Sequence, residues 1–170
     1  HYRISPTKKV WVTGSTHPGE EEKVFTVFTR LRSVFHNLVV VVAPRHIERA
    51  QDVEVLARNF NFRVVRLTQL EKSYGKDFDV LIVDTIGELK KIYSFADVVW
   101  MGGSFVTHGG QNPIEPALFA KPIFSGPHIF NFEFVYGELE KHQAVVMVHA
   151  EDELFVKLKE FLNNPLLSSG

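Results

Sequence analysis

The 170-residue sequence contains no cysteine, which excludes disulfide bonds and thiolate metal sites and is compatible with a reducing compartment. Long hydrophobic runs are also missing, because segments such as residues 38–44 (LVVVVAP) fall far short of the roughly 20 residues that a membrane-spanning helix needs. There is no excess of positive charge, since 19 lysines and arginines stand against 20 aspartates and glutamates. A broad basic surface for nucleic acid is therefore not expected, and an anionic ligand must be bound by local groups.

Several motifs of catalysis and cofactor binding are missing as well. Neither GxGxxG nor GxxxxGK[ST] occurs, which argues against a dinucleotide-binding dehydrogenase and a P-loop nucleotide hydrolase. Neither GxSxG nor HExxH occurs, and the eight histidines are scattered along the chain. A serine-hydrolase elbow and a zinc site are therefore not favoured, and we expect no metal.

What is present is an alternation of short apolar segments with segments of helical period, in a chain of the size of one domain. Segments such as LVVVVA and DVLIVD are apolar at nearly every position, which is typical of parallel strands covered on both faces. The predicted strands span residues 10–13, 38–43, 62–66, 78–83, 98–101, 122–125 and 145–148. The predicted helices span residues 20–35, 47–59, 88–95, 113–119, 132–141 and 152–162.

This alternation predicts an α/β fold, a single Rossmann-like, doubly wound and mostly parallel sheet of about six strands with helices on both faces. In such sheets ligands bind outside the carboxyl ends of the strands. We therefore expect a site in the turns that follow strands.

The first of these turns is GSTHPGE, residues 14–20, which two more glutamates follow. The hydroxyls of Ser15 and Thr16 and the free amides of the next helix can bind an anion. A side chain of the turn can equally well cap that helix, with Pro18 in its first turn. The sequence leaves both interpretations open. We interpret the three glutamates at 20–22 as a favourable start of the helix, at the positive end of its dipole.

Two further turns carry polar groups. Arg45 follows the most hydrophobic strand in APRHIER, where its planar guanidinium suits a phosphate or a carboxylate. It can also form a surface ion pair with Glu48 or Asp52, which is usually weak. In DTIGEL, Gly87 and Glu88 open a helix against which a base or a ribose can lie, although the preceding residues can also serve only as caps.

The turn richest in glycine is WMGGSFVTHGGQNPIEPALFAKP, residues 100–122. Its two glycine pairs permit positive φ and a close backbone approach, as the binding of a phosphate by amides requires. Glu115 lies three residues after Asn112, so both side chains face one side of the first helical turn. Such a carboxylate can accept both hydroxyls of a ribose, and the same spacing also fits a capping box. The crowding of glycines favours ligand binding.

Together, GSTHPGEE, APRH, DTIGEL followed by Tyr93, and ADVVWMGGSFVTHGGQNPIEPALFAKPIFSGPHIFNF resemble the carboxyl-terminal domain of the bacterial 3-deoxy-D-manno-octulosonic acid (Kdo) transferases. The resemblance covers residues 10–163 in the family's order, and GGSxxxxGGxNPxEP followed by GPHxxNF is specific. Phe105, and Gln111 where the family more often has histidine, depart from the pattern. The family has the two-domain GT-B glycosyltransferase architecture, so residues 1–170 are expected to form its nucleotide-sugar donor-binding half.

The resemblance implies an enzyme that transfers Kdo from CMP-Kdo to a lipid A precursor in lipopolysaccharide biosynthesis, by an inverting reaction without metal or other cofactor. Arg45 would hold the donor's anionic groups and Glu115 the ribose hydroxyls, while two glycine-containing segments would line the nucleotide. The hydroxyls after the first strand would face the phosphate or the sugar across the interdomain cleft. The residues expected at the donor are Ser15, Thr16, Arg45, Gly87, Glu88, Leu89, Met101, Gly102, Gly103, Ser104, Asn112 and Glu115.

The resemblance also implies that the general base, a glutamate, the acceptor-binding surface and the membrane anchor belong to an amino-terminal domain absent from this chain. The sequence begins with HYRISPTKK and without methionine. We therefore expect a soluble fragment, inactive alone, of a protein at the cytoplasmic face of the bacterial inner membrane. Two alternatives remain: a GT-B relative that uses a UDP-sugar, as a glycosyltransferase or an epimerase, and a non-catalytic nucleotide-binding module.

Overall fold

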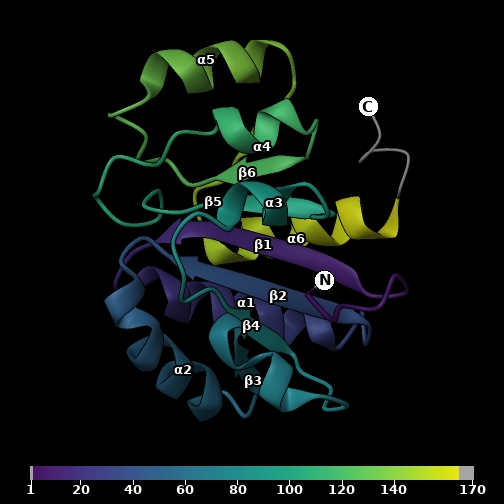
Figure 1. Ribbon diagram of the computed structural model, residues 1–170. Coiled ribbons are helices and arrows are strands. Elements are labelled where there is room, and N and C mark those ends of the chain that lie inside the picture. The colour runs from purple at the N-terminus through teal and green to yellow at the C-terminus, as the bar shows by residue number, and fades with distance from the viewer. Residues whose placement is uncertain (1, 165–170) are drawn as a thin grey trace.

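The computed structural model describes residues 2–164 as one open sheet of seven strands between two layers of helices (Figure 1). The strands run in the order β3-β4-β2-β1-β5-β6-β7, and every neighbouring pair is parallel. Their bounds are β1 (Lys9–Thr16), β2 (Leu38–Pro44), β3 (Val64–Arg66), β4 (Val80–Ile82), β5 (Val98–Met101), β6 (Ile123–Ser125) and β7 (Val145–Met147). The predicted doubly wound α/β fold is confirmed.

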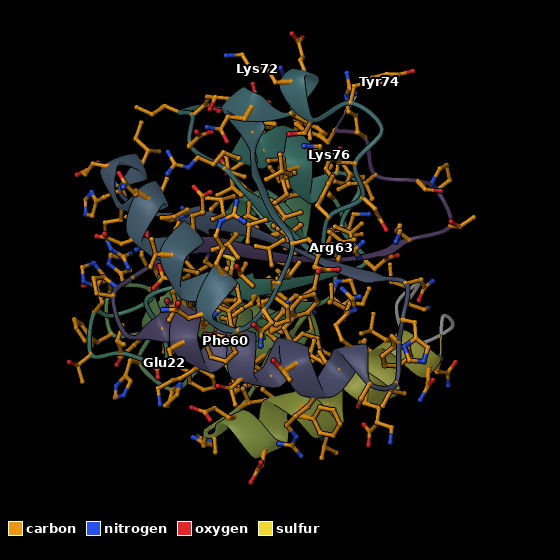
Figure 2. The ribbon with its side chains drawn as sticks, turned by 90° about the horizontal axis from the view of Figure 1, so that it is seen from below. Glu22, Phe60, Arg63, Lys72, Tyr74 and Lys76 are labelled. Carbon is orange, nitrogen blue, oxygen red and sulfur yellow. The ribbon has the colours of Figure 1, made fainter. Side chains whose placement is uncertain are left out.

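Six α-helices cover the two faces of this sheet in the described part of the chain. They are α1 (Glu20–Arg32), α2 (Ala50–Asn59), α3 (Leu89–Tyr93), α4 (Ile114–Leu118), α5 (Glu133–Lys141) and α6 (Glu151–Asn163). Helices α1, α2 and α6 pack on one face and α3, α4 and α5 on the other, and Figure 2 shows α1 and α6 side by side. The longest helices within residues 2–164, α1 and α6, have 13 residues each, and none of the described helices could span a membrane.

The core divides into two layers because side chains alternate along each strand. In β2, Val40 and Val42 pack against α1 and α2, whereas Val39 and Val41 face the opposite layer. All seven residues of β2 are buried, as expected of a parallel strand covered on both faces. This explains why LVVVVAP carries almost no polar side chain.

Several predicted elements are shorter in the structure. Helix α1 ends at Arg32 instead of residue 35, because the chain closes a turn in which the Val34 and Phe35 amides donate to the Leu31 carbonyl. The predicted helix at 47–59 begins with a 3₁₀ turn at Ile47–Arg49. Between β3 and β4, where no helix was predicted, the chain forms two 3₁₀ turns, Leu67–Gln69 and Glu71–Ser73.

The chain reverses its direction of growth across the sheet at β1, which has β2 on one side and β5 on the other. In doubly wound sheets the ligand crevice lies at such a switch point, outside the carboxyl ends of the strands. The turns after β1 and β5 are therefore brought together by the topology.

Candidate functional site

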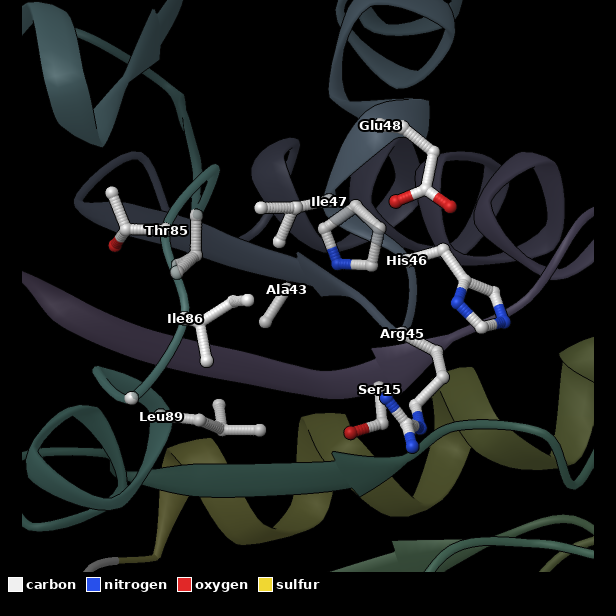
Figure 3. A pocket seen from close by; sticks show the side chains of 12 residues that line it. Ser15, Ala43, Arg45, His46, Ile47, Glu48, Thr85, Ile86 and Leu89 are labelled. Atoms are coloured by element: carbon white, nitrogen blue, oxygen red, sulfur yellow. The ribbon is translucent and has the colours of Figure 1, made fainter.

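A pocket of about 340 Å³ opens at the carboxyl ends of β1, β2 and β4 (Figure 3). Arg45 and Ser15 lie side by side on one wall, and Ile86 and Leu89 lie across from them. Ala43 from the end of β2 lies between the two walls. This volume falls at the lower end of the range of about 300–1,000 Å³ that is typical of small-molecule sites, and its mixture of apolar walls with a few polar groups is typical too.

Arg45 is exposed and forms no ion pair among the described residues. The alternative of a surface pair with Glu48 or Asp52 is therefore not observed. The neighbouring Arg49 behaves differently, because it binds the buried carboxylate of Glu21 with two hydrogen bonds of 2.8 and 3.1 Å. Of the two arginines in APRHIER, only Arg45 keeps its guanidinium for a ligand.

Ser15 and Thr16 end β1 but point in different directions. Ser15 has φ of 56° at an irregularity in the pairing of β1 with β2, and it lines the pocket beside Arg45. Thr16 is fully buried, and its hydroxyl donates to Glu21 over 2.8 Å. Only one of the two hydroxyls expected at the donor is therefore available, because the irregular backbone turns Thr16 into the interior.

The glycine-rich loop after β5 surrounds the side chain of Glu20, which is fully buried. The backbone N–H groups of residues 103–105 donate to its carboxylate over 2.8, 3.2 and 3.3 Å. The Trp100 ring N–H and the His17 backbone N–H donate to it over 3.2 and 3.1 Å. Five N–H groups thus converge on one carboxylate of the protein itself.

Burial raises the pKa of the Glu20 carboxyl, and the N–H donors oppose this shift because they favour its ionised form. These contacts add to two interpretations made from the sequence. Gly103 and Ser104 were expected to line the nucleotide, and their amides already bind Glu20. Glu20 and Glu21 do more than favour the start of α1, because both are buried ligands of neighbouring loops; Glu22 alone is exposed.

The other residues predicted at the start of this loop, Met101, Gly102 and Ser104, are buried. Met101 packs in the core layer with α3, and the Ser104 hydroxyl donates to the Met101 carbonyl over 2.6 Å. Gly102 lies so close to β1 that a Cβ there would meet the Ser15 carbonyl oxygen at 2.2 Å. Glycine is thus required at 102 for the contact between the two turns, and Met101 and Ser104 have no free polar group for a nucleotide.

Histidines gather next to this loop. The ring of His17 stacks on that of His108 at 3.7 Å and meets that of His46 edge-on at 6.2 Å. Its Nε2 lies 2.9 Å from the Gln111 side-chain nitrogen. Burial first, and then the nearby His108 and His46, lower the pKa of His17 to about 4, so its ring is neutral at pH 7. Within residues 2–164 no three histidine, aspartate or glutamate side chains are arranged so that they could hold a metal ion.

The turn after β4 brings Gly87 and Leu89 to the pocket. Glu88 differs, because its carboxylate accepts a hydrogen bond of 2.6 Å from the hydroxyl of Tyr2. Burial and this contact with Glu88 raise the pKa of Tyr2 to about 12, which keeps the hydroxyl a donor. Thr85 also lines the pocket, and its hydroxyl is buried without a hydrogen-bond partner in the described structure.

Asn112 and Glu115 start α4, outside the pocket that contains Arg45. The Asn112 side-chain oxygen accepts from the Ile114 amide over 3.1 Å. Glu115 is exposed, and within residues 2–164 its carboxylate accepts no hydrogen bond of the kind that would complete a capping box. It lies near Tyr93, whose pKa is raised mainly by burial and then by the charge of Glu115. The carboxylate of Glu115 thus remains free.

The structure divides the predicted residues into three groups. Ser15, Arg45, Gly87 and Leu89 line one pocket, whereas Asn112 and Glu115 lie at the start of α4. The residues whose polar groups are already bound or buried are Thr16, Glu88, Met101, Gly102, Gly103 and Ser104.

Sequence reasoning missed Glu20, Glu21 and Thr85. The only signal in the sequence was a run of three glutamates directly after a strand-end turn, and a favourable helix start accounts for the same run.

Comparisons with known proteins identify what the chain is similar to. No protein-family model matches the chain. It is 33% identical over 157 residues to the 3-deoxy-D-manno-octulosonic acid transferase of Haemophilus influenzae, which covers 92% of this chain and 36% of that protein. It is 36% identical over 152 residues to the transferase of the same name from Aquifex aeolicus, covering 89% and 41%. The chain thus spans less than half the length of these curated relatives.

Solved structures also resemble this chain. The C-terminal CMP-Kdo binding domain of WaaA from Acinetobacter baumannii has a TM-score of 0.84 at 28% identity, covering 94% of this chain and 83% of that one. The S. aureus MnaA structure with UDP, at a TM-score of 0.64 and 12% identity over 95% of this chain and 38% of that one, shares the fold alone. The resemblance to the carboxyl-terminal domain of the Kdo transferases is confirmed.

Proposed function

Because the chain is a relative of the carboxyl-terminal part of the Kdo transferases over 92% of its length, we propose that it is the donor-binding half of such an enzyme. The full protein would transfer Kdo from CMP-Kdo to a lipid A precursor in lipopolysaccharide biosynthesis. The observation that carries this proposal is the pocket at the strand ends, in which Arg45 has a guanidinium free of ion pairs beside the Ser15 hydroxyl.

The chemistry of the donor suits these groups. CMP-Kdo carries a bridging phosphate and a sugar carboxylate, and its cleavage leaves negative charge on the departing CMP. A guanidinium placed against that phosphate stabilises the charge as it develops, and a hydroxyl donor adds to it. Arg45 and Ser15 would do this without a metal ion, and Glu115 would accept the ribose hydroxyls.

The activity of the whole protein requires groups that this chain does not supply. We propose that the general base and the acceptor-binding surface lie in an amino-terminal domain, and that the complete enzyme works at the cytoplasmic face of the bacterial inner membrane. The donor would then be enclosed between the two domains, which would exclude water from the departing phosphate. The chain alone would bind CMP weakly and transfer no Kdo.

Calorimetric titration of the chain with CMP and with UMP tests the proposal. We expect tighter binding of CMP, and we expect Glu115→Ala to weaken it because the ribose loses its acceptor. Tighter binding of UMP would favour a GT-B protein that uses a UDP-sugar, and binding of neither nucleotide would contradict the assignment. Kdo transfer by the chain alone would refute the placement of the general base in another domain.

A further inference from the structure

The first turn of α1 contains two buried glutamates next to an exposed one. Glu20 and Glu21 are 0% and 1% exposed, whereas Glu22 lies at the surface (Figure 2). Buried carboxylates are costly unless their oxygens are fully hydrogen-bonded. Both glutamates meet this requirement through residues of other turns, so the start of α1 is bonded to the turns that follow β1, β2 and β5.

The loop that Glu20 binds lies against the wall of the pocket. Next to the bound amides, the Gly102 N–H donates to the Gly14 carbonyl over 2.7 Å. The same glycine contacts the backbone of Ser15 so closely that no side chain fits between them. A displacement of the glycine loop would therefore displace the backbone that carries the Ser15 hydroxyl.

Glu21 acts on the same wall from the other side. It accepts the Thr16 hydroxyl, and the Thr16 carbonyl in turn accepts the Arg45 backbone N–H over 2.9 Å. Its other contacts bind Arg49 in the turn that follows Arg45. The backbone on both sides of the Arg45 side chain is thus tied to α1.

We propose that Glu20 is a positioning residue for the donor site, whose buried carboxylate fixes the glycine loop and thereby the pocket wall formed by Ser15 and Arg45, without contact with the ligand. The proposal rests on the proposed function, because it concerns the same pocket. When a ligand has to order its own binding site, the free energy needed for the ordering is subtracted from the free energy of binding. The internal carboxyl group removes this cost, because its oxygens accept the hydrogen bonds of the loop amides before any donor arrives.

Glu20→Gln tests the proposal, since it keeps the shape of the side chain but replaces one acceptor oxygen by an N–H donor group. We expect CMP to bind about tenfold more weakly or worse, the equivalent of at least about 1.4 kcal/mol, measured by calorimetry well below the melting temperature. Glu22→Gln, the same change at the exposed neighbour, should leave the affinity unchanged.

A second control separates positioning from loss of stability. Leu162 is buried in α6 near the amino end of β1, away from the pocket, and its carbonyl accepts from the Lys9 amine at the start of that strand. Leu162→Ala destabilises the core without touching the site, and we expect it to bind CMP as the wild type does. Glu20→Asp keeps the charge on a shorter side chain, so its affinity is expected between those of the wild type and Glu20→Gln.

The outcomes are distinct. Wild-type affinity in a folded Glu20→Gln chain would overturn the positioning role, and if that variant fails to fold, wild-type affinity in Glu20→Asp would overturn it. Failure of the wild type to bind CMP would contradict the proposed function instead. Positioning is then decided by amide hydrogen exchange at Gly102 and Arg45, where faster exchange in the Glu20 variant than in Leu162→Ala supports the proposal and equal exchange overturns it.

Discussion

Two neighbouring regions at the carboxyl ends of the strands differ in how their polar groups are satisfied. The glycine loop after β5 has its amides bound to the protein's own Glu20, in the interior. The pocket beside it has Arg45 with no ion pair among the described residues and a Ser15 hydroxyl that faces the cavity. The first region is complete without a ligand and the second is not.

This difference shows how anion-binding groups can serve structure instead of ligand binding. Amides next to glycines at the end of a parallel strand are suited to a phosphate. Here they donate their hydrogen bonds to a carboxylate from the neighbouring helix α1 instead. The capacity to bind a free anion is therefore found where a charged group is left unpaired, at Arg45.

The largest effect is expected from Glu20→Leu, which leaves five buried N–H groups without their acceptor. A loss of about 3–5 kcal/mol in the free energy of unfolding is typical when one partner of such a buried charged contact is removed. Urea unfolding measures it, with Glu22→Leu as the exposed counterpart. Equal stability of the two variants would show that the hydrogen bonds between Glu20 and the glycine loop do not stabilise the fold.

Arg45→Ala is expected to weaken ligand binding without a loss of stability, in contrast to Glu20→Leu. It removes the free guanidinium and weakens CMP binding by about tenfold or more, since hydrogen bonds to charged groups contribute about 1.5–3 kcal/mol. The melting temperature is expected to stay within about 2 °C of the wild type, because the side chain is exposed and unpaired. Arg30→Ala, at an arginine in a surface ion pair with Asp152, serves as the control in the same titration. Unchanged CMP affinity in Arg45→Ala would show that this pocket does not bind the nucleotide.

The adjacent hydroxyls offer a smaller and sharper comparison. Thr16→Val leaves Glu21 without one of its donors, and we expect a loss of about 1–2 kcal/mol in stability, with a smaller loss of CMP affinity than Ser15→Ala causes. Ser15→Ala is expected to do the opposite, a weaker affinity at unchanged stability. If both variants behave alike in the two measurements, the distinction between the buried and the open hydroxyl is wrong.

The smallest effect is expected from pH and concerns His17. Its pKa is lowered to about 4 from its ordinary value of 6.5, so the unfolded chain takes up a proton before the native one does. Stability contributed by neutral His17 is therefore complete above pH 6.5, falls as the pH drops towards 4, and changes no further below that. Thermal unfolding from pH 7 to 4 is expected to show a smaller drop in His17→Gln than in the wild type, and equal drops would contradict this.

The fold could be predicted from the sequence because strands buried on both faces leave a direct pattern. Segments such as DVLIVD have few other interpretations, and β5 was predicted with its observed bounds, Val98–Met101. No element was predicted between β3 and β4, since short 3₁₀ turns such as Leu67–Gln69 have no clear periodicity.

The site was only partly predictable for a different reason. The bond between Glu20 and the Gly103 amide joins residues 83 positions apart, and nothing within GEEE distinguishes a carboxylate that caps a helix from one that fills a distant loop. The exposure of Ser15 and the burial of Thr16 depend on an irregularity between β1 and β2. Such contacts arise from the tertiary structure, which local sequence does not specify.

Amide hydrogen exchange of residues 103–105 tests the central contrast most directly. The account predicts that these three amides are protected in the ligand-free chain, because Glu20 accepts their hydrogen bonds in the interior, and that saturating CMP adds little protection. Glu20→Gln is expected to expose them. Rapid exchange in the ligand-free wild type, with protection only after CMP is added, would show that the loop receives the donor's phosphate and would contradict the account.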